Sequence, residues 1–258
     1  MEKENKTNQP KKKTSHFENI ERNRKKFSFK FAAFLNHIII HKPKVKYLGK
    51  KEFPNEPIMV LANHVGKKAP VKIELHYPRD FRMWGTYEMT EGFKSAHRYL
   101  RTTYYHDKKH MPKWLAFIIA SLAAPFANMF YKGMRIIPTY PDARLMNTMR
   151  LSVKTYESGK DIVIYPEDSS HGYDDEIKHF FAGFVSLLDF LYNKGHDVPV
   201  YVTYLNRKTN TFIVNEQIKY SELKNKYSNN EEIAEAMRIL MNSLTHFSKK
   251  SPASTSIA

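Results

Sequence analysis

The sequence predicts an α/β fold, with a mixed β-sheet of about six or seven strands flanked by helices. Short apolar segments typical of strands alternate along the chain with longer segments whose apolar residues recur at helical spacing. The chain has 258 residues with 41% hydrophobic content, enough to bury one sizeable core. We therefore expect a single domain over residues 27–247, a basic disordered tail at 1–26 and a second disordered tail at 248–258.

An apolar helix is expected directly after the N-terminal tail. Residues 27–40, FSFKFAAFLNHIII, carry bulky apolar side chains on a helical period, and Lys42-Pro43 is a plausible helix stop. This helix belongs either to the core or to a bilayer interface.

The remaining elements follow from the same two patterns. Strands are expected at 44–49, 58–63, 81–89, 134–139, 161–167, 198–206 and 210–220, and helices at 69–77, 142–159, 179–195 and 231–244. Gly159 is the expected C-cap of the second of these helices. Because strand and helix alternate, we expect a layered domain whose site lies at strand ends.

The longest apolar run is WLAFIIASLAAPFANMF, residues 114–130. It is slightly shorter than the about 20 residues that a comfortable bilayer span needs, and Pro125 weakens a spanning interpretation further. A partly buried core helix, a monotopic helix embedded in one leaflet and a true span all remain open.

Charge and composition restrict the partners. With 42 Lys and Arg against 26 Asp and Glu, the net charge is +16, which indicates an anionic partner such as nucleic acid, anionic lipid or a phosphorylated substrate. Residues 1–30 hold ten Lys or Arg and four Glu, so this tail either binds an anionic membrane surface or only increases solubility. The absence of Cys excludes disulfides and thiolate metal sites, and the N-terminus does not read as a secretory signal, so a cytosolic location is expected.

The first candidate site is Asn63-His64, where an apolar strand gives way to a Gly-containing turn. Strand-to-helix junctions of this kind present side chains to ligands. Lys67 and Lys68 follow, and neighbouring cations disfavour the imidazolium, so His64 should stay neutral and able to accept a proton. A purely structural histidine is the alternative.

The second candidate site is VIYPEDSSHGYDDE, residues 163–176, a buried strand that ends in a dense polar loop. Asp168, Ser170 and Asp174 faintly resemble a calcium loop but lack the full ligand set. A Ser-His-Asp triad within the loop is weak as well, because side chains so close in sequence rarely converge. His106 and His110 have metal-compatible spacing without an obvious third ligand, so no metal is expected.

Together these segments resemble the glycerolipid or lysophospholipid acyltransferase family, over roughly residues 43–215. Asn63 and His64 match the family's first motif, in which the histidine is the general base. Gly133, Ile136 and Ile137 match the second motif, Tyr165, Pro166 and Glu167 match the third, and Pro199 matches the first proline of the fourth.

The chain departs from these motifs at charged positions. Ala69 stands where the family has the aspartate that orients the base, and Thr139 and Ser170 stand where it has phosphate-associated arginines. Loss of the orienting carboxylate typically costs around four orders of magnitude in rate unless another group replaces it. Glu74 and Asp168 are the candidates to orient His64. Lys67, Lys68 and His171 are the candidates to replace the arginines, beside Asn63, Thr139 and Glu167 as further substrate-binding residues.

The resemblance implies an O-acyltransferase of phospholipid biosynthesis, similar to 1-acylglycerol-3-phosphate acyltransferase. His64 would take the proton of a lysophospholipid or other lipid-like hydroxyl, which then attacks a thioester donor. Acyl-CoA or acyl-carrier protein would be the co-substrate, with no other cofactor. We expect a peripheral or monotopic protein on the cytoplasmic face of an anionic membrane.

Three alternatives stay open. The chain is a catalytically weak or inactive relative that binds acyl chains or anionic lipid, a hydrolase that uses water as acceptor, or a basic nucleic-acid-binding protein. The last requires base-stacking aromatics in a basic groove, whereas many Phe residues lie in strongly apolar runs. Nucleic acid is therefore not an expected partner.

Overall fold

The sheet is built around β2 (Met59–Ala62), whose four residues are all buried. A continuous apolar run of this kind is typical of a parallel strand that is covered on both faces. The computed structural model describes residues 16–51, 53–65, 68–168 and 176–248. Within these ranges the sheet has eight strands, which confirms the predicted mixed α/β class with slightly more strands than expected.

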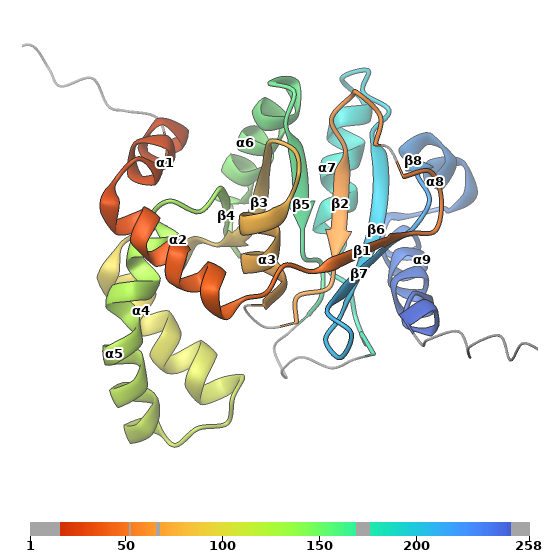
Figure 1. The fold of residues 1–258 in the computed structure, drawn as a ribbon. Coiled ribbons are helices and arrows are strands. Elements are labelled where there is room, and N and C mark those ends of the chain that lie inside the picture. Colours follow the sequence, from red (N-terminus) through yellow and green to blue (C-terminus); the bar gives the residue numbers. More distant parts are fainter. Residues whose placement is uncertain (1–15, 52, 66–67, 169–175, 249–258) are drawn as a thin grey trace, which may run out of the picture.

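The strand order brings distant segments side by side (Figure 1). The order is β1 (Lys44–Tyr47), β7 (Thr211–Val214), β6 (Pro199–Asn206), β2, β5 (Asp161–Ile164), β3 (Phe81–Thr86) and β4 (Ile136–Thr139), with β8 (Ile218–Lys219) paired to β6. All neighbouring strands from β6 to β4 are parallel, whereas β7 runs antiparallel to β6. The carboxyl ends of the five parallel strands therefore meet at one edge of the sheet.

Each face of the sheet carries its own apolar core. Met59 and Leu61 of β2 belong to the core beneath α6 (Leu145–Glu157), α7 (Gly183–Tyr192) and α9 (Asn230–Ser243). Val60 and Ala62 belong to the opposite core, with α2 (Phe27–Ile39) and α3 (Lys68–His76). This alternation follows from the two-residue period of a strand. Gly159 follows α6 with a φ of +77°, a value that glycine adopts readily and that is typical of a C-cap.

A helical unit lies beside α2, away from the sheet. It consists of α4 (Phe93–Tyr99), the π-helical segment η2 (Leu100–Asp107) and α5 (Lys113–Tyr131). Ala116, Ala120 and Ala124 form the buried stripe of α5, and only 22% of its most apolar window is buried. Within the described ranges α5 is the helix long and apolar enough to cross a membrane. α5 is thus partly buried, with Trp114 and Leu122 among its exposed residues, and the structure does not decide among the three alternatives.

Residues 16–24 form helix α1 (His16–Arg24), whereas the sequence predicts a disordered tail to residue 26. Polar contacts with distant segments hold this helix. Arg24 pairs with Glu74 and donates to the carbonyl oxygen of Gly133 at 2.8 Å, and Glu21 accepts from Arg82 at 2.9 Å. His16 lies with Nε2 2.9 Å from the carbonyl oxygen of Ile136, on β4. These partners lie too far along the chain for a local pattern to indicate them.

Two further short helices, α8 (Tyr220–Lys226) and η3 (His246–Ser248), follow the sheet, and η1 (Tyr87–Met89) follows β3. The predicted helix at 179–195 begins later than expected, at Gly183. The segment before it is instead fixed to the loop after β5, because Phe181 N donates to Pro166 O at 2.9 Å and Asp168 N to His179 O at 3.1 Å.

Gly133, between α5 and β4, lies in close contact with α2. A Cβ at this position would lie 2.2 Å from Cδ2 of Phe29, which is buried and stacks on Phe130 with 5.6 Å between ring centroids. We expect Gly133→Ala to lower the free energy of unfolding by about 1–3 kcal/mol, because overpacking forces Phe29 to move. Urea denaturation measures this change.

Gly183→Ala is the matched control for this substitution. Its Cβ would meet its nearest neighbour, Trp84, at 3.7 Å, an ordinary contact distance. Adding Phe29→Leu to Gly133→Ala should recover part of the loss through coupling between the two sites. Equal effects of the two glycine substitutions would contradict the close approach.

Candidate functional site

His64 and Glu167 are brought together by the parallel pairing of β2 and β5. Leu61 is in register with Ile164, so the residues that follow the two strands emerge side by side at the carboxyl edge. Glu167 is buried, and its Oε2 accepts a hydrogen bond from the backbone N of His64 at 2.9 Å. The structure thus unites residues that lie 103 positions apart. The sequence assigns Glu167 to substrate binding, and the structure gives it a contact that fixes the backbone of His64.

Asn63 fixes the same strand end from the other side. Its Oδ1 accepts from the backbone N of Leu205 at 2.7 Å, and its Nδ2 donates to the carbonyl oxygen of Leu205 at 3.2 Å. The side chain is 3% exposed. Asn63 was expected among the substrate-binding residues, but both ends of its amide are used to join β2 to β6.

The His64 ring lies at the edge against an aromatic neighbour. Its centroid is 5.2 Å from that of Tyr165, with the rings edge-on at 61°. Val65, the next residue, has a φ of +46°, a left-handed conformation that is strained for a β-branched side chain. Strained backbone of this kind clusters at functional sites. The strained backbone at Val65 therefore supports the choice of the end of β2 as a candidate site.

Glu74 does not occupy the position predicted for it. It lies on α3 six residues beyond Lys68, so about 9 Å along the helix from its start. Its carboxylate is bound by Arg24 and by the backbone N of Arg135, the latter at 3.1 Å. Burial raises the pKa of Glu74, while both arginines act against this shift. The sequence predicts that Glu74 orients His64, whereas the structure pairs one of its carboxylate oxygens with Arg24 and the other with the backbone N of Arg135.

Lys108 is a residue of this edge that sequence reasoning missed. Burial lowers its pKa, and the charges of Glu167 and Asp168 act in the opposite direction. The lysine follows η2 and comes from the helical unit beside α2. Because HDKKH has the composition of a solvated loop, no local signal indicates that Lys108 lies near two acidic residues of the loop after β5.

The remaining predicted site residues do not all lie near His64. Asp168 directly follows Glu167 and remains a candidate to orient His64. Thr139 ends β4, three strand spacings or about 14 Å from β2, and its hydroxyl donates to the carbonyl oxygen of Gly85 at 2.9 Å. Lys68 is exposed at the start of α3, whereas Lys67 and His171 lie outside the described residues.

Ala69, which the sequence analysis places at the position of an orienting aspartate, is fully buried in the core with residues of α2 and α3. Across the described ranges, no three His, Asp or Glu side chains are arranged to hold a metal ion. Nδ1 of His106 lies 2.7 Å from the carbonyl oxygen of Met111, and the faint calcium motif extends beyond these ranges.

Comparison with known proteins adds a fold likeness. No protein-family model and no curated protein matches the chain. Among solved structures it is similar to the crystal structure of the 1-acyl-sn-glycerophosphate (LPA) acyltransferase PlsC from Thermotoga maritima. The identity is 13% and the TM-score 0.45, over 92% of this chain and 83% of the other. A likeness of this size carries no argument about function, which must come from the site itself.

The hydrogen bond from His64 N to Glu167 predicts that two substitutions of Glu167 lower the free energy of unfolding by different amounts. Glu167→Ala leaves a partly buried N–H without its acceptor and should cost about 1–3 kcal/mol of the free energy of unfolding. Glu167→Gln keeps an acceptor oxygen and should cost clearly less. Urea denaturation of both variants tests this order, and equal losses would show that the carboxylate does not hold the strand end through this bond.

Proposed function

We propose that this chain is a membrane-associated O-acyltransferase that moves a fatty acyl group from a thioester donor to a lysophospholipid or similar lipid hydroxyl. The observation that carries the proposal is the placement of His64 at the carboxyl edge of a parallel sheet, with its backbone held by Glu167. Ligands bind at this edge in open α/β sheets. The order of the motifs around His64, Gly133 and Glu167 adds support.

In the proposed reaction the imidazole of His64 accepts the proton of the acceptor hydroxyl. The hydroxyl oxygen attacks the thioester carbonyl carbon, an ester bond forms, and the carbon–sulfur bond breaks. The thiolate leaves and is protonated, so the proton lost by the acceptor is balanced. Asp168 is the proposed orienting carboxylate. Lys108 lies close enough to Glu167 and Asp168 for their charges to favour its protonated form.

An apolar face on α2 and α5 supports the proposed membrane association. Phe34, Ile39, Trp114 and Leu122 are 60%, 74%, 67% and 71% exposed. The face continues over the exposed residues Phe27, Phe31, Ile38, Phe117, Ile118 and Phe126. The two helices are packed together, with the stacked rings of Phe29 and Phe130 between them. So many exposed large apolar side chains on two neighbouring helices indicate an interaction site.

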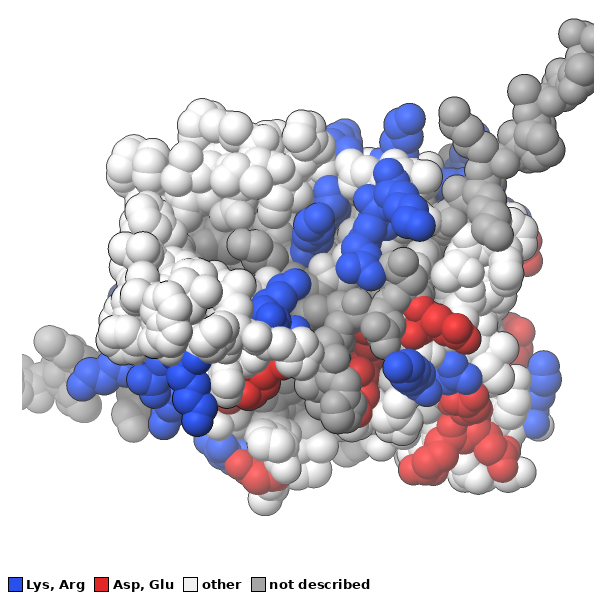
Figure 2. Space-filling view, turned by 90° about the horizontal axis from the view of Figure 1, so that it is seen from below, with Lys and Arg blue, Asp and Glu red and all other residues white. Residues whose placement is uncertain are grey.

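Charges around this face favour an anionic bilayer as its occupant. Lys25 and Lys26 precede α2, Lys113 begins α5 and Lys132 follows it, and all four are exposed. Figure 2, seen from below Figure 1, shows a bulky region on the left with almost no charged residues and Lys and Arg side chains beside it. Apolar helices bordered by lysines bind the interface of an anionic leaflet. The acceptor lipid would then reach His64 from this surface.

A second candidate function is lipid binding without efficient catalysis. The buried Ala69 and the ion-paired Glu74 favour it, because neither provides the carboxylate that usually orients such a base. An acylation assay with labelled acyl-CoA or acyl-carrier protein and a panel of lysolipids separates the two. Lipid binding without label transfer from either donor would support the second candidate.

His64→Ala should lower acyl transfer by about 10²–10⁴-fold, because a general base contributes this much to such reactions. His110→Asn is the control, since His110 is exposed and its left-handed φ of +53° suits asparagine. Label transfer to each lipid measures both variants. Unchanged transfer by His64→Ala would exclude it as the base.

Leu122→Glu should weaken flotation of the protein with anionic liposomes, because it places a carboxylate among the exposed apolar side chains of α5. Ile239→Glu is matched in chemistry and exposure, at 56% exposed on α9, and should float like the unmodified protein. Flotation in low and high salt separates the apolar contribution from the electrostatic one. Equal behaviour of the two variants would place membrane contact elsewhere.

A further inference from the structure

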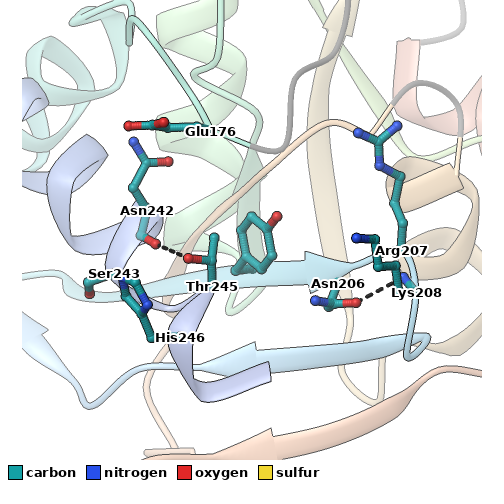
Figure 3. Close-up of a pocket in the computed structure, with 9 residues that line it drawn as sticks. Glu176, Asn206, Arg207, Lys208, Asn242, Ser243, Thr245 and His246 are labelled. Carbon is teal, nitrogen blue, oxygen red and sulfur yellow. Dashed lines mark hydrogen bonds between the residues drawn. The ribbon is translucent and has the colours of Figure 1, made fainter. Parts of the chain in front are cut away.

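A pocket of about 650 Å³ lies at the carboxyl end of β6. Figure 3 shows Arg207 and Lys208 on one side of it and Asn242 and His246 on the other, and its lining includes Glu176, which borders residues outside the described ranges. A second pocket, of about 100 Å³, lies where α1, α2 and α5 meet. The lining residues of this second pocket and their neighbours along the chain all belong to the described ranges.

The second pocket is polar and carries two lysines. The residues that line it are Asn23, Lys26, Ser28, Asn128, Met129 and Lys132. Lys26 and Lys132 are exposed, and in the described part of the chain neither forms an ion pair and no acidic side chain lines the pocket. The volume is roughly that of three water molecules, so a group of the size of a phosphate fits. Two ammonium groups around such a space attract an anion.

The N-terminus of α2 forms one wall of this pocket. Lys26 is the N-cap residue of the 13-residue helix, and its side chain makes no capping hydrogen bond. Ser28, the second residue of the helix, lines the pocket, and the first turn contains no acidic residue. The first N–H groups of a helix have no intrahelical partner, and together with the helix dipole they favour an anion.

Carbonyl groups at the end of α5, which would repel an anion, are bound by other donors. Lys132 N donates to Asn128 O at 3.2 Å, and Met134 N donates to Phe130 O at 3.1 Å. Asn23 Nδ2 donates to Lys132 O at 3.2 Å. The two lysines and the start of α2 are therefore the groups that meet a negative charge in the pocket.

A buried amide in the lining lacks a hydrogen bond. Asn128 is 9% exposed, and its Oδ1 has no hydrogen-bond partner among the described residues. Buried polar atoms normally have such a partner, and each exception calls for an explanation. Because an amide oxygen only accepts hydrogen bonds, a ligand that satisfies Asn128 must carry a hydroxyl or N–H group in addition to its negative charge.

Apolar side chains lie directly beside these polar groups. Phe27, between Lys26 and Ser28 in the chain, is 80% exposed and stacks on Phe31 with 5.9 Å between ring centroids. Met129 of α5 lines the pocket itself. A ligand in this place therefore meets lysines and exposed apolar surface together, which is the environment of a lipid headgroup at the boundary of a bilayer.

We propose that this pocket binds the headgroup of an anionic phospholipid, with its phosphodiester between Lys26, Lys132 and the start of α2 and with a headgroup hydroxyl that donates to Oδ1 of Asn128. Phosphatidylglycerol has this chemistry. The inference rests on the proposed membrane contact of α2 and α5 and is separate from acyl transfer. Lys132 precedes β4, near the amino end of that strand, whereas His64 follows the carboxyl end of β2.

Flotation with two kinds of vesicle tests the headgroup preference. Both contain phosphatidylcholine and the same fraction of a singly charged lipid, either phosphatidylglycerol or phosphatidylmethanol, whose headgroup has no hydroxyl. The unmodified protein should bind the phosphatidylglycerol vesicles about threefold to tenfold more tightly, because the buried amide gains a hydrogen bond. Asn128→Ala should bind both kinds alike, and thermal melting verifies that this variant is folded.

Lys26→Ala/Lys132→Ala should weaken binding to both kinds of vesicle about tenfold or more, because charge-assisted hydrogen bonds to the phosphate are lost. Lys25→Ala/Lys30→Ala is the matched control, since it removes two exposed lysines near the start of α2 that do not line the pocket. The control should lose only the general attraction to the bilayer, which salt screens, and should keep the preference for phosphatidylglycerol. Equal losses in the two double variants would overturn the inference.

Calorimetric titration with glycerophosphoglycerol, which is the phosphatidylglycerol headgroup without its acyl chains, tests the pocket without a bilayer. Its binding should depend on Asn128 and on both lysines of the pocket. Tighter binding of inorganic phosphate than of glycerophosphoglycerol would overturn the lipid assignment in favour of a free phosphate, and equal binding of the two kinds of vesicle by the unmodified protein would overturn it as well. A headgroup preference without label transfer to any lipid leaves the pocket assigned while the proposed reaction fails.

Discussion

The end of β2 is fixed from both sides by buried polar side chains, and the candidate site depends on this arrangement. Asn63 joins it to β6 through Leu205, and Glu167 joins it to β5 through the backbone N of His64. These bonds continue the sheet past the point where regular pairing stops. They hold the chain while it turns through the left-handed residue Val65. The His64 side chain is thereby set at a defined place on the carboxyl edge.

The sequence predicted the parts of the fold that depend on local pattern. Continuous apolar runs marked β2, β5 and β6, and the parallel pairing of β2 with β5 brings His64 and Glu167 together. The contacts between distant segments could not be predicted. Glu74 was expected near His64 because it lies close in sequence, but arginines from α1 and from the segment before β4 bind it. Lys108 and the pocket after β6 were missed for the same reason, because the fold alone brings their parts together.

Arg24 of helix α1 contacts both α3, where it pairs with the buried Glu74, and α2, which carries part of the apolar face. Glu74 is almost fully buried, and removal of one partner of such a pair is far more costly than the net strength of the pair suggests. Arg24 also lies over the ring of Phe29, 4.9 Å from its centroid, so the residue that pairs with Glu74 contacts α2 as well. The orientation of α2, and with it the apolar face shared with α5, is thus set by a few contacts around Gly133.

The outer strands of the sheet have a consequence for self-association. An edge strand offers unpaired backbone groups to a second chain, and proteins block this with proline, charge or a covering element. In the described part of the chain, β4 contains Pro138 and is contacted by His16 of α1, while β1 at the other edge carries the exposed residues Lys44 and Lys46. Growth of aggregates by strand addition is therefore opposed at both edges. Any clustering of the protein in water would instead begin at the exposed aromatic side chains of α2 and α5.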